Sequence, residues 1–198
     1  MNKKKIFIAV DTNNISKAKK IINDTQTNKI KVGYKFGLEF FYSKDGRKFL
    51  SNFKNRIIFL DLKLNDIPNT IKSAMVSVKD LKISYLTVHL SSGLSALKAL
   101  KKESRNVKIA GVTTLTSLNN KDLKEIGYNK KVDKLVKHQA KLATKAKLDA
   151  IVCSGHEIRS VKRVFKKEII TPGIKMQNVK NDQKRIMGPA DALSLIHI

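Results

Sequence analysis

The stretch FLDLKLNDIPNT, residues 59–70, carries the densest chemistry in the chain and decides how the rest is interpreted. The apolar run Ile57–Leu60 predicts a buried strand that leads into it. Side chains two positions apart on a strand share a face, so we expect Asp61 and Lys63 to point the same way and form a charge pair. Asp66 follows just beyond the strand. Two carboxylates and an ammonium held together contribute little to packing, and they indicate a catalytic site.

The second half of this stretch predicts the start of a helix. Pro68 has a fixed φ that suits a first helical turn, and Ile71, Met75 and Val78 follow with helical spacing. We expect the Asp66 side chain to cap the free N–H groups of this helix. A solvated ion pair beside an ordinary helix cap would also explain the Asp-x-Lys pattern taken alone.

Length and composition predict one domain. A chain of 198 residues with 41% hydrophobic content can build one real core, and we assign residues 1–193 to it. No apolar run approaches the roughly 20 residues that cross a bilayer, so we expect neither an anchor nor a signal peptide. The single cysteine, Cys153, cannot form an internal disulfide, and its apolar flank predicts a buried residue. The expected location is the cytoplasm.

The net charge of +25 suggests a nucleic-acid partner, but its distribution does not. Only six of the 41 basic residues are arginine, and the lysines are spread along every helical segment. The chain has no tryptophan and four tyrosines, so aromatic side chains for stacking on bases are scarce. We expect weak, salt-sensitive attraction to polyanions and no specific nucleic-acid binding. A basic RNA-associated protein remains the alternative from another functional class.

Strand-like and helix-like segments alternate along the whole chain. This alternation predicts an α/β fold with a parallel sheet, and its spacing favours a (β/α)₈ TIM-type barrel. Between the strands, helical spacing is clearest for the apolar positions from Val132 to Ala143. The strand-like runs number seven, so we expect the eighth strand and helix to be missing; the runs are residues 6–10, 30–36, 57–60, 85–89, 107–113, 150–153 and 169–171.

Polar residues follow these runs at their carboxyl ends, where barrel enzymes collect their functional groups. Neither a helix bundle nor a nucleic-acid module would place polar residues regularly at the ends of strand-like runs. The residues at these ends are Asp11, Lys35, Asp61, Lys63, His89, residues 113–117, residues 154–157 and residues 171–173.

The string DLKLNDIPNT, residues 61–70, closely resembles the signature of the orotidine 5'-monophosphate decarboxylase family. On the second strand, only Lys35 continues into the family pattern Lys-x-Gly-x-Glu-x-Phe, so we assign Lys35 to the active site and Lys31 to the surface. The resemblance implies conversion of orotidine 5'-monophosphate to UMP in pyrimidine biosynthesis. It extends from Ile6 to Leu193 through further similar pieces at residues 9–11, 87–89, 112–117, 152–154, 171–174 and 182–187.

The resemblance also implies roles for the charged residues of the site. Asp11 and Lys35 would bind the ribose hydroxyls, and Lys35 would extend the charge array. Asp61 would lie against the substrate carboxylate, and Lys63 would protonate C6 of the pyrimidine as carbon dioxide leaves. Asp66 completes the catalytic set. Neither a metal nor a cofactor is implied.

Further substrate contacts follow from the same resemblance. Asp66 and Thr70 would reach into the active site of a partner subunit, which implies a homodimer, and Ile67 belongs with them to the substrate-binding set. Thr116 would contact the base and Gln183 the phosphate. Simpler explanations stay open. Asp11 and Thr116 would serve as strand-end caps, Gln183 as a surface residue and His89 as a buried histidine bonded to the backbone.

Two departures from the family pattern concern the end of the chain. Lys175 stands where an arginine is usual, so a two-point contact to phosphate becomes a single-point contact. Residues 194–198 do not resemble the family, and we expect them to be a non-native tail.

The nearest alternative activity is that of the related magnesium-dependent enzymes, a sugar-phosphate decarboxylase or hexulose-phosphate synthase. Those enzymes place a metal-binding glutamate where this chain has Lys35, and they lack the string DIPNT.

Overall fold

Strands and helices alternate along the chain in the computed structural model, which describes residues 5–54, 56–174 and Gly188. The strands are β1 (Lys5–Ala9), β2 (Lys31–Gly37), β3 (Ile57–Leu64), β4 (Tyr85–His89), β5 (Lys108–Val112), β6 (Ala150–Val152) and β7 (Glu168–Ile170). The α-helices are α1 (Ile15–Asp24), α2 (Leu38–Phe41), α3 (Gly46–Asn52), α4 (Pro68–Ser77), α5 (Gly93–Glu103), α6 (Asn120–Glu125), α7 (Val132–Lys145) and α8 (Ile158–Lys162). Three short 3₁₀ turns accompany them, at Lys79–Leu81, Leu90–Ser92 and Gly155–Glu157.

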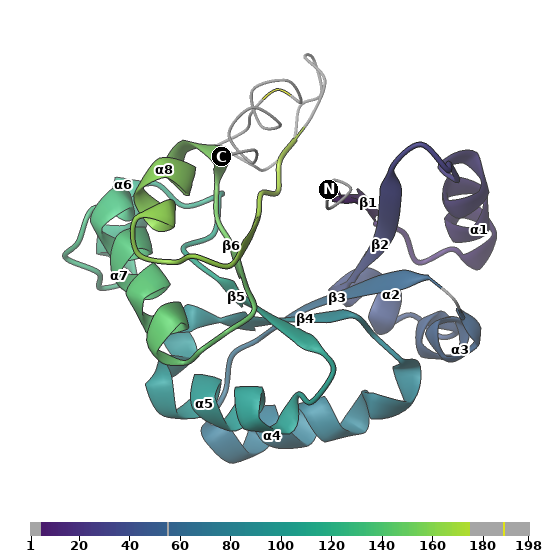
Figure 1. The fold of residues 1–198 in the computed structure, drawn as a ribbon, viewed down its shortest axis with the longest axis horizontal. Coiled ribbons are helices and arrows are strands. Elements are labelled where there is room, and N and C mark those ends of the chain that lie inside the picture. Colours follow the sequence, from purple (N-terminus) through teal and green to yellow (C-terminus); the bar gives the residue numbers. More distant parts are fainter. Residues whose placement is uncertain (1–4, 55, 175–187, 189–198) are drawn as a thin grey trace.

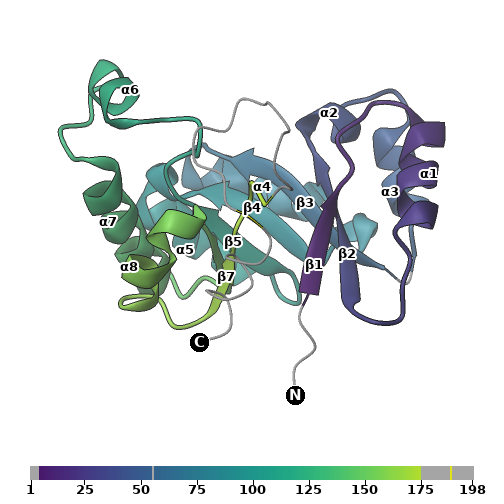
Figure 2. The same ribbon diagram turned by 90° about the horizontal axis from the view of Figure 1, so that it is seen from above.

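The seven described strands form one sheet, and each strand pairs in parallel with the next along the chain. The sheet curls around an inner space and carries its longer helices on the outside (Figure 1). The predicted α/β barrel architecture is therefore confirmed. The expected lack of an eighth strand and the non-native tail concern residues outside the described ranges. Figure 2 shows α2 and α6 on the same side of the sheet.

The main core lies between the sheet and the outer helices. It takes the outward positions of the strands, such as Tyr34 and Phe36 on β2 and Ile58 and Leu60 on β3. The predicted apolar face of α7 is confirmed, since its buried residues are Leu135, Val136, Gln139, Ala140 and Ala143. The single cysteine is buried as expected. None of the described helices combines the length and the apolar character needed to cross a membrane.

The inner face of the curved sheet carries a second, smaller apolar cluster. Phe59 and Tyr85 are buried there, and the Phe7 ring meets both edge-on at centroid distances of 4.9 and 5.2 Å. Gly33 on β2 makes room for this ring. A Cβ atom at Gly33 would lie 2.8 Å from the Phe7 ring carbons, closer than side chains tolerate. Because alternate strand positions face inward, the inner space is a packed layer rather than a channel.

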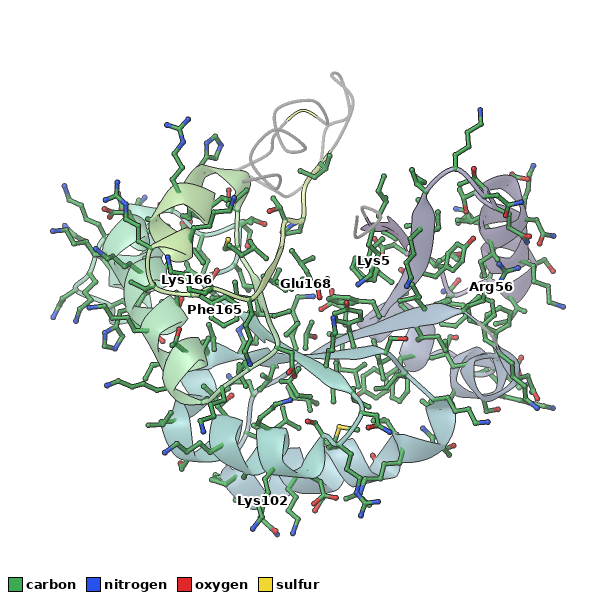
Figure 3. The ribbon with its side chains drawn as sticks, viewed as in Figure 1. Lys5, Arg56, Lys102, Phe165, Lys166 and Glu168 are labelled. Carbon is green, nitrogen blue, oxygen red and sulfur yellow. The ribbon has the colours of Figure 1, made fainter. Side chains whose placement is uncertain are left out.

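A polar network lies below this layer, at the amino ends of the strands. Lys5 on β1 donates to the Tyr85 hydroxyl, and its Nζ atom is 3.2 Å from Glu168 Oε1. Tyr85 donates to Glu168 at 2.8 Å, and Lys108 Nζ donates to Glu168 Oε2 at 2.9 Å. Lys5 and Glu168 face each other inside the curve of the sheet, whereas Lys102 points outward (Figure 3). The network connects β1 with β7, the first and last strands of the described sheet.

The start of α4 differs from the prediction. The helix buries Ile71 and Met75 as expected, but its N-cap is Ile67 and no side chain caps it. The Asp66 carboxylate instead accepts the Ile67 N–H at 2.7 Å. The predicted cap is wrong because Asp66 lies one residue too early, and Pro68 at the first turn has no N–H to offer.

Candidate active site

Four charged side chains meet at the carboxyl ends of β1, β2 and β3. Lys35 Nζ donates to Asp11 Oδ1 at 3.0 Å and lies 3.8 Å from Asp61 Oδ2. Lys63 Nζ donates to the same Asp61 oxygen at 2.7 Å. The charges therefore alternate in sign along the row Asp11, Lys35, Asp61 and Lys63, which we call the charge row. The predicted Asp61–Lys63 pair is confirmed. Lys35 lies in the charge row, whereas Lys31 is exposed at the other end of β2, as expected.

The charge row lines a cavity of about 280 Å³. All four members contribute to its wall, together with Val10, Gly37, Leu38, Glu39 and Phe40. The apolar members come from the end of β1 and from α2, which lies on the side of the sheet toward which the strands run (Figure 2). The cavity is thus lined by both charged and apolar side chains, as small-molecule sites commonly are.

Asp61 is the most deeply placed member of the charge row, with 8% of its surface exposed. Its Oδ2 atom receives the Lys63 hydrogen bond, and its Oδ1 atom accepts a hydrogen bond of 2.9 Å from the Thr87 hydroxyl on β4. A buried carboxylate requires such partners, because an unpaired buried charge is strongly unfavourable. Both oxygens are bonded, so the plane of the carboxylate is fixed.

The backbone of β3 is irregular where it carries these residues. Leu60 pairs with Leu86, and Leu64 pairs with Val88. Between these two pairs β3 advances by four residues while β4 advances by two, so β3 bulges. Within this irregular stretch Lys63 has a φ of 48°, which is a left-handed conformation. This conformation costs a residue that has a Cβ atom roughly 1–2 kcal/mol. β3 extends to Leu64, so Asp61 and Lys63 both lie on the strand, as expected from the sequence. Such bulges often redirect side chains next to active sites.

His89, at the end of β4, is half-buried rather than fully buried. Burial lowers the pKa of its imidazole below 6.5, and the positive charge of Lys63 lowers it further, while Asp61 acts in the opposite sense. At neutral pH the ring is therefore uncharged, and it adds no positive charge to the row.

The remaining predicted residues do not join the charge row. Asp66, Ile67 and Thr70 are exposed around the start of α4, with 66% of Ile67 accessible to solvent. Thr116 is half-buried in the loop between β5 and α6 and is not among the residues that line the cavity. Lys175 and Gln183 lie outside the described residues.

Sequence reasoning gave no role to Thr87, although it contacts two members of the charge row. Its place in the sequence carries one usable signal. A threonine two positions before His89 shares the inner face of β4 with it, one pleat below the strand end.

The donor chemistry of the charge row suits an anionic organic substrate more than a metal ion. Its two ammonium groups are hydrogen-bond donors without a lone pair to offer a cation. In the described part of the chain, no cluster of three or more histidine, cysteine or acidic side chains is spaced to hold a metal.

Comparison with known proteins agrees with this site. The family model described as "Orotidine 5'-phosphate decarboxylase / HUMPS family" matches residues 4–198. Curated relatives named orotidine 5'-phosphate decarboxylase include those of Wolbachia pipientis, 39% identical, and Carboxydothermus hydrogenoformans, 34% identical. Each comparison covers 96% of this chain, and it covers 85% and 84% of the respective relative.

Solved structures of similar fold carry the same name. The orotidine 5'-phosphate decarboxylase of Lactobacillus acidophilus superimposes with a TM-score of 0.80 at 27% identity, over 96% of this chain and 85% of that one. The Methanocaldococcus jannaschii protein, solved with the inhibitor BMP, has a TM-score of 0.78 at 22% identity, over 98% and 86% of the two chains, and supports the fold alone. With a family model matched over nearly its whole length, the chain belongs to the orotidine 5'-phosphate decarboxylase / HUMPS family.

Proposed function

We propose that this protein converts orotidine 5'-monophosphate to UMP and carbon dioxide, as a cofactor-independent carbon–carbon lyase of pyrimidine biosynthesis. The observation that carries the proposal is the charge row, in which Lys63 Nζ lies 2.7 Å from the buried Asp61 carboxylate at the edge of a cavity. Family membership and the names of the relatives supply the substrate.

The reaction uses the charge row in two stages. In the first, the substrate carboxylate lies against Asp61, and the repulsion between two carboxylates favours loss of the substrate's carboxylate as neutral carbon dioxide. The bond between C6 and this carboxylate breaks, and its electron pair stays on C6. In the second, the Lys63 ammonium donates a proton to C6 and later regains one from solvent. The positive charge of Lys63 also stabilises the developing negative charge at C6.

The other proposed residues hold the substrate in place. Asp11 and Lys35, joined by a hydrogen bond of 3.0 Å, suit the two ribose hydroxyls because one accepts and the other donates. Thr116 would bind the base, and Lys175 and Gln183 the phosphate. Binding energy from the distant phosphate would hold the substrate carboxylate against Asp61, although the two negative charges repel each other.

The active form in this proposal is a cytoplasmic homodimer. The exposed positions of Asp66, Ile67 and Thr70 favour this assignment, because side chains that leave their own cavity are free to enter a partner's cavity.

The direct test is to incubate the purified protein with orotidine 5'-monophosphate and to follow UMP formation by ultraviolet absorbance, with and without EDTA. We expect turnover that survives EDTA, because the ammonium groups of Lys35 and Lys63 supply the positive charge that a metal would otherwise supply. No UMP formation would refute the proposal. Activity on a sugar phosphate that is lost in EDTA and restored by Mg²⁺ would instead assign the protein to the magnesium-dependent branch.

A further inference from the structure

Thr87 forms hydrogen bonds to both members of the Asp61–Lys63 pair. Its side chain lies on the inner face of β4 and is completely buried. The hydroxyl donates to Asp61 Oδ1 at 2.9 Å and accepts the backbone N–H of Lys63 at 2.8 Å. A hydroxyl has one hydrogen to donate, and here that hydrogen goes to the carboxylate of the charge row.

The second of these bonds lies where regular strand pairing is interrupted. The register between β3 and β4 shifts between Leu60 and Leu64, and Lys63 lies inside this interval with a φ of 48°. Within a strand this conformation is strained for a non-glycine residue and needs support from its surroundings. The Thr87 hydroxyl is positioned to give this support, because it takes the N–H of this same residue.

The first bond sets the orientation of Asp61. With Oδ1 bonded to Thr87, the other oxygen faces both lysines, at 2.7 Å from Lys63 Nζ and 3.8 Å from Lys35 Nζ. Rotation of the carboxylate would break the Thr87 bond and leave a buried oxygen without that donor, which is unfavourable. One hydroxyl therefore fixes both the direction of the carboxylate and the backbone from which the ammonium extends.

We propose that Thr87 is a positioning residue for decarboxylation, whose hydroxyl holds the Asp61 carboxylate and the Lys63 backbone in their working arrangement. The inference rests on the proposed function for its chemistry, and on geometry alone for its structural part. Thr87 does not line the cavity, so it acts through Asp61 and Lys63 rather than on the substrate.

The test compares Thr87→Val, which has nearly the same shape without the hydroxyl, with Thr87→Ser, which keeps the hydroxyl. The matched control is Thr113→Val. Thr113 is equally buried, and its hydroxyl donates to the Val152 carbonyl at 2.9 Å, outside the charge row. Each variant is assayed for kcat and KM with orotidine 5'-monophosphate, for UMP affinity and for thermal unfolding.

We expect Thr87→Val to lower kcat by about 10- to 100-fold, the usual effect of a small misplacement of reacting groups. KM and UMP affinity should stay within about threefold of the wild type, because the Thr87 hydroxyl does not itself bind the substrate or the product. Thr87→Ser should recover most of kcat, and Thr113→Val should retain it. Wild-type kcat in Thr87→Val, a loss confined to KM, or equal impairment of Thr87→Ser would each overturn the inference.

A second measurement separates this inference from the proposed function. Crystal structures of the wild type and Thr87→Val report the geometry whether or not orotidine 5'-monophosphate is the substrate. We expect the variant to show a rotated Asp61 carboxylate or a Lys63 backbone outside the left-handed region. If both keep the wild-type arrangement, the hydroxyl is not what positions them. A wild type inactive toward orotidine 5'-monophosphate would refute the function while leaving this structural test in force.

Discussion

Lys63 must satisfy two demands at once, one for its ammonium and one for its backbone. The ammonium bonds to Asp61 at 2.7 Å, while the backbone has a φ of 48° within the bulge of β3. A lysine in a regular strand would avoid this strain. Lys82, Arg105 and Lys147 share this left-handed φ but lie between elements, whereas Lys63 has it within a strand.

Replacing Lys63 with alanine should remove turnover while leaving product binding largely intact. We expect kcat to fall by at least about 100-fold, because a general acid contributes that much or more. UMP affinity should change only several-fold, since the proton is donated in the transition state and not to the product. Kinetics and calorimetry with UMP measure the two effects. Lys31→Ala, a change at an exposed lysine on β2, is the matched control.

Turnover of Lys63→Ala within about tenfold of the wild type would remove Lys63 from the role of proton donor. Equal loss of activity in Lys31→Ala would point to a general effect of charge rather than to this site.

At the scale of single residues, the sequence predicted what depends on near neighbours. Asp61 and Lys63 are two positions apart, and the alternation of side chains along a strand predicted that they would share a face. Thr87 is 24 residues from Lys63 along the chain, and its hydrogen bonds depend on a register shift that no local pattern encodes. The role of Thr87 therefore emerged only from the structure.

The elements followed the same division between local and distant causes. The alternating pattern located all seven described strands, because burial of one strand face is a local demand. It also placed Asp61 and Lys63 at the end of β3, and the strand extends through both of them to Leu64. The register shift between β3 and β4 was not predicted, because it depends on how a second strand pairs with β3. The cap of α4 was missed for a smaller reason, a displacement of one residue.

The exposed start of α4 leads to a prediction about assembly. If Asp66 completes the site of a partner, Lys63→Ala and Asp66→Ala chains should each be inactive alone and recover activity after mixing. Each mixed dimer would hold one complete site, so random exchange should restore up to about a quarter of wild-type activity. Activity measured after demonstrated subunit exchange tests this.

The negative control is a mixture of Lys63→Ala and Asp61→Ala chains. Asp61 and Lys63 contact each other within one chain, so no mixed dimer of this kind regains a complete site. Failure of the Asp66→Ala mixture to exceed this control would assign Asp66 to its own chain's site or to no site.

At the scale of the whole molecule, the dominant fact is the net charge of +25. Such a charge opposes compaction by self-repulsion and attracts anions such as a nucleotide. Ion pairs between distant parts of the fold are therefore expected to stabilise the folded state against this repulsion. Glu168 is central to the largest of them in the described structure, since it binds Lys5, Tyr85 and Lys108 at the amino ends of four strands.

The surroundings of Glu168 give its contribution a definite pH dependence. Burial alone would raise the pKa of Glu168, but hydrogen bonds from Lys108 and Tyr85 and the charge of Lys5 outweigh it and lower the pKa below 4.5. The unfolded chain then binds the proton more readily than the folded one. The stabilisation is present above pH 4.5 and is lost as the pH falls through the lower pKa of the folded state.

Replacing Glu168 with glutamine should therefore destabilise the protein at neutral pH but not in acid. We expect a loss of about 1–2 kcal/mol at pH 7, as for other partly buried charged hydrogen bonds. The melting temperature should fall by roughly 3–8 °C for a domain of this size. The two curves should converge once the pH falls below the lowered pKa of Glu168 in the folded state, because the wild-type carboxylate is then protonated as well.

Glu125→Gln is the matched control for this experiment. It removes the same charge from a solvent-exposed pair, in which Lys121 Nζ and Glu125 Oε1 are 3.9 Å apart. Surface pairs of this kind contribute about 0–1 kcal/mol, so its melting temperature should stay near that of the wild type at every pH. A Glu168→Gln protein that melts with the wild type at pH 7, or whose deficit persists in acid, would mean that the network adds nothing through charge. The connection between β1 and β7 would then depend on the inner apolar cluster, against which Phe7 of β1 and Ile170 of β7 both pack.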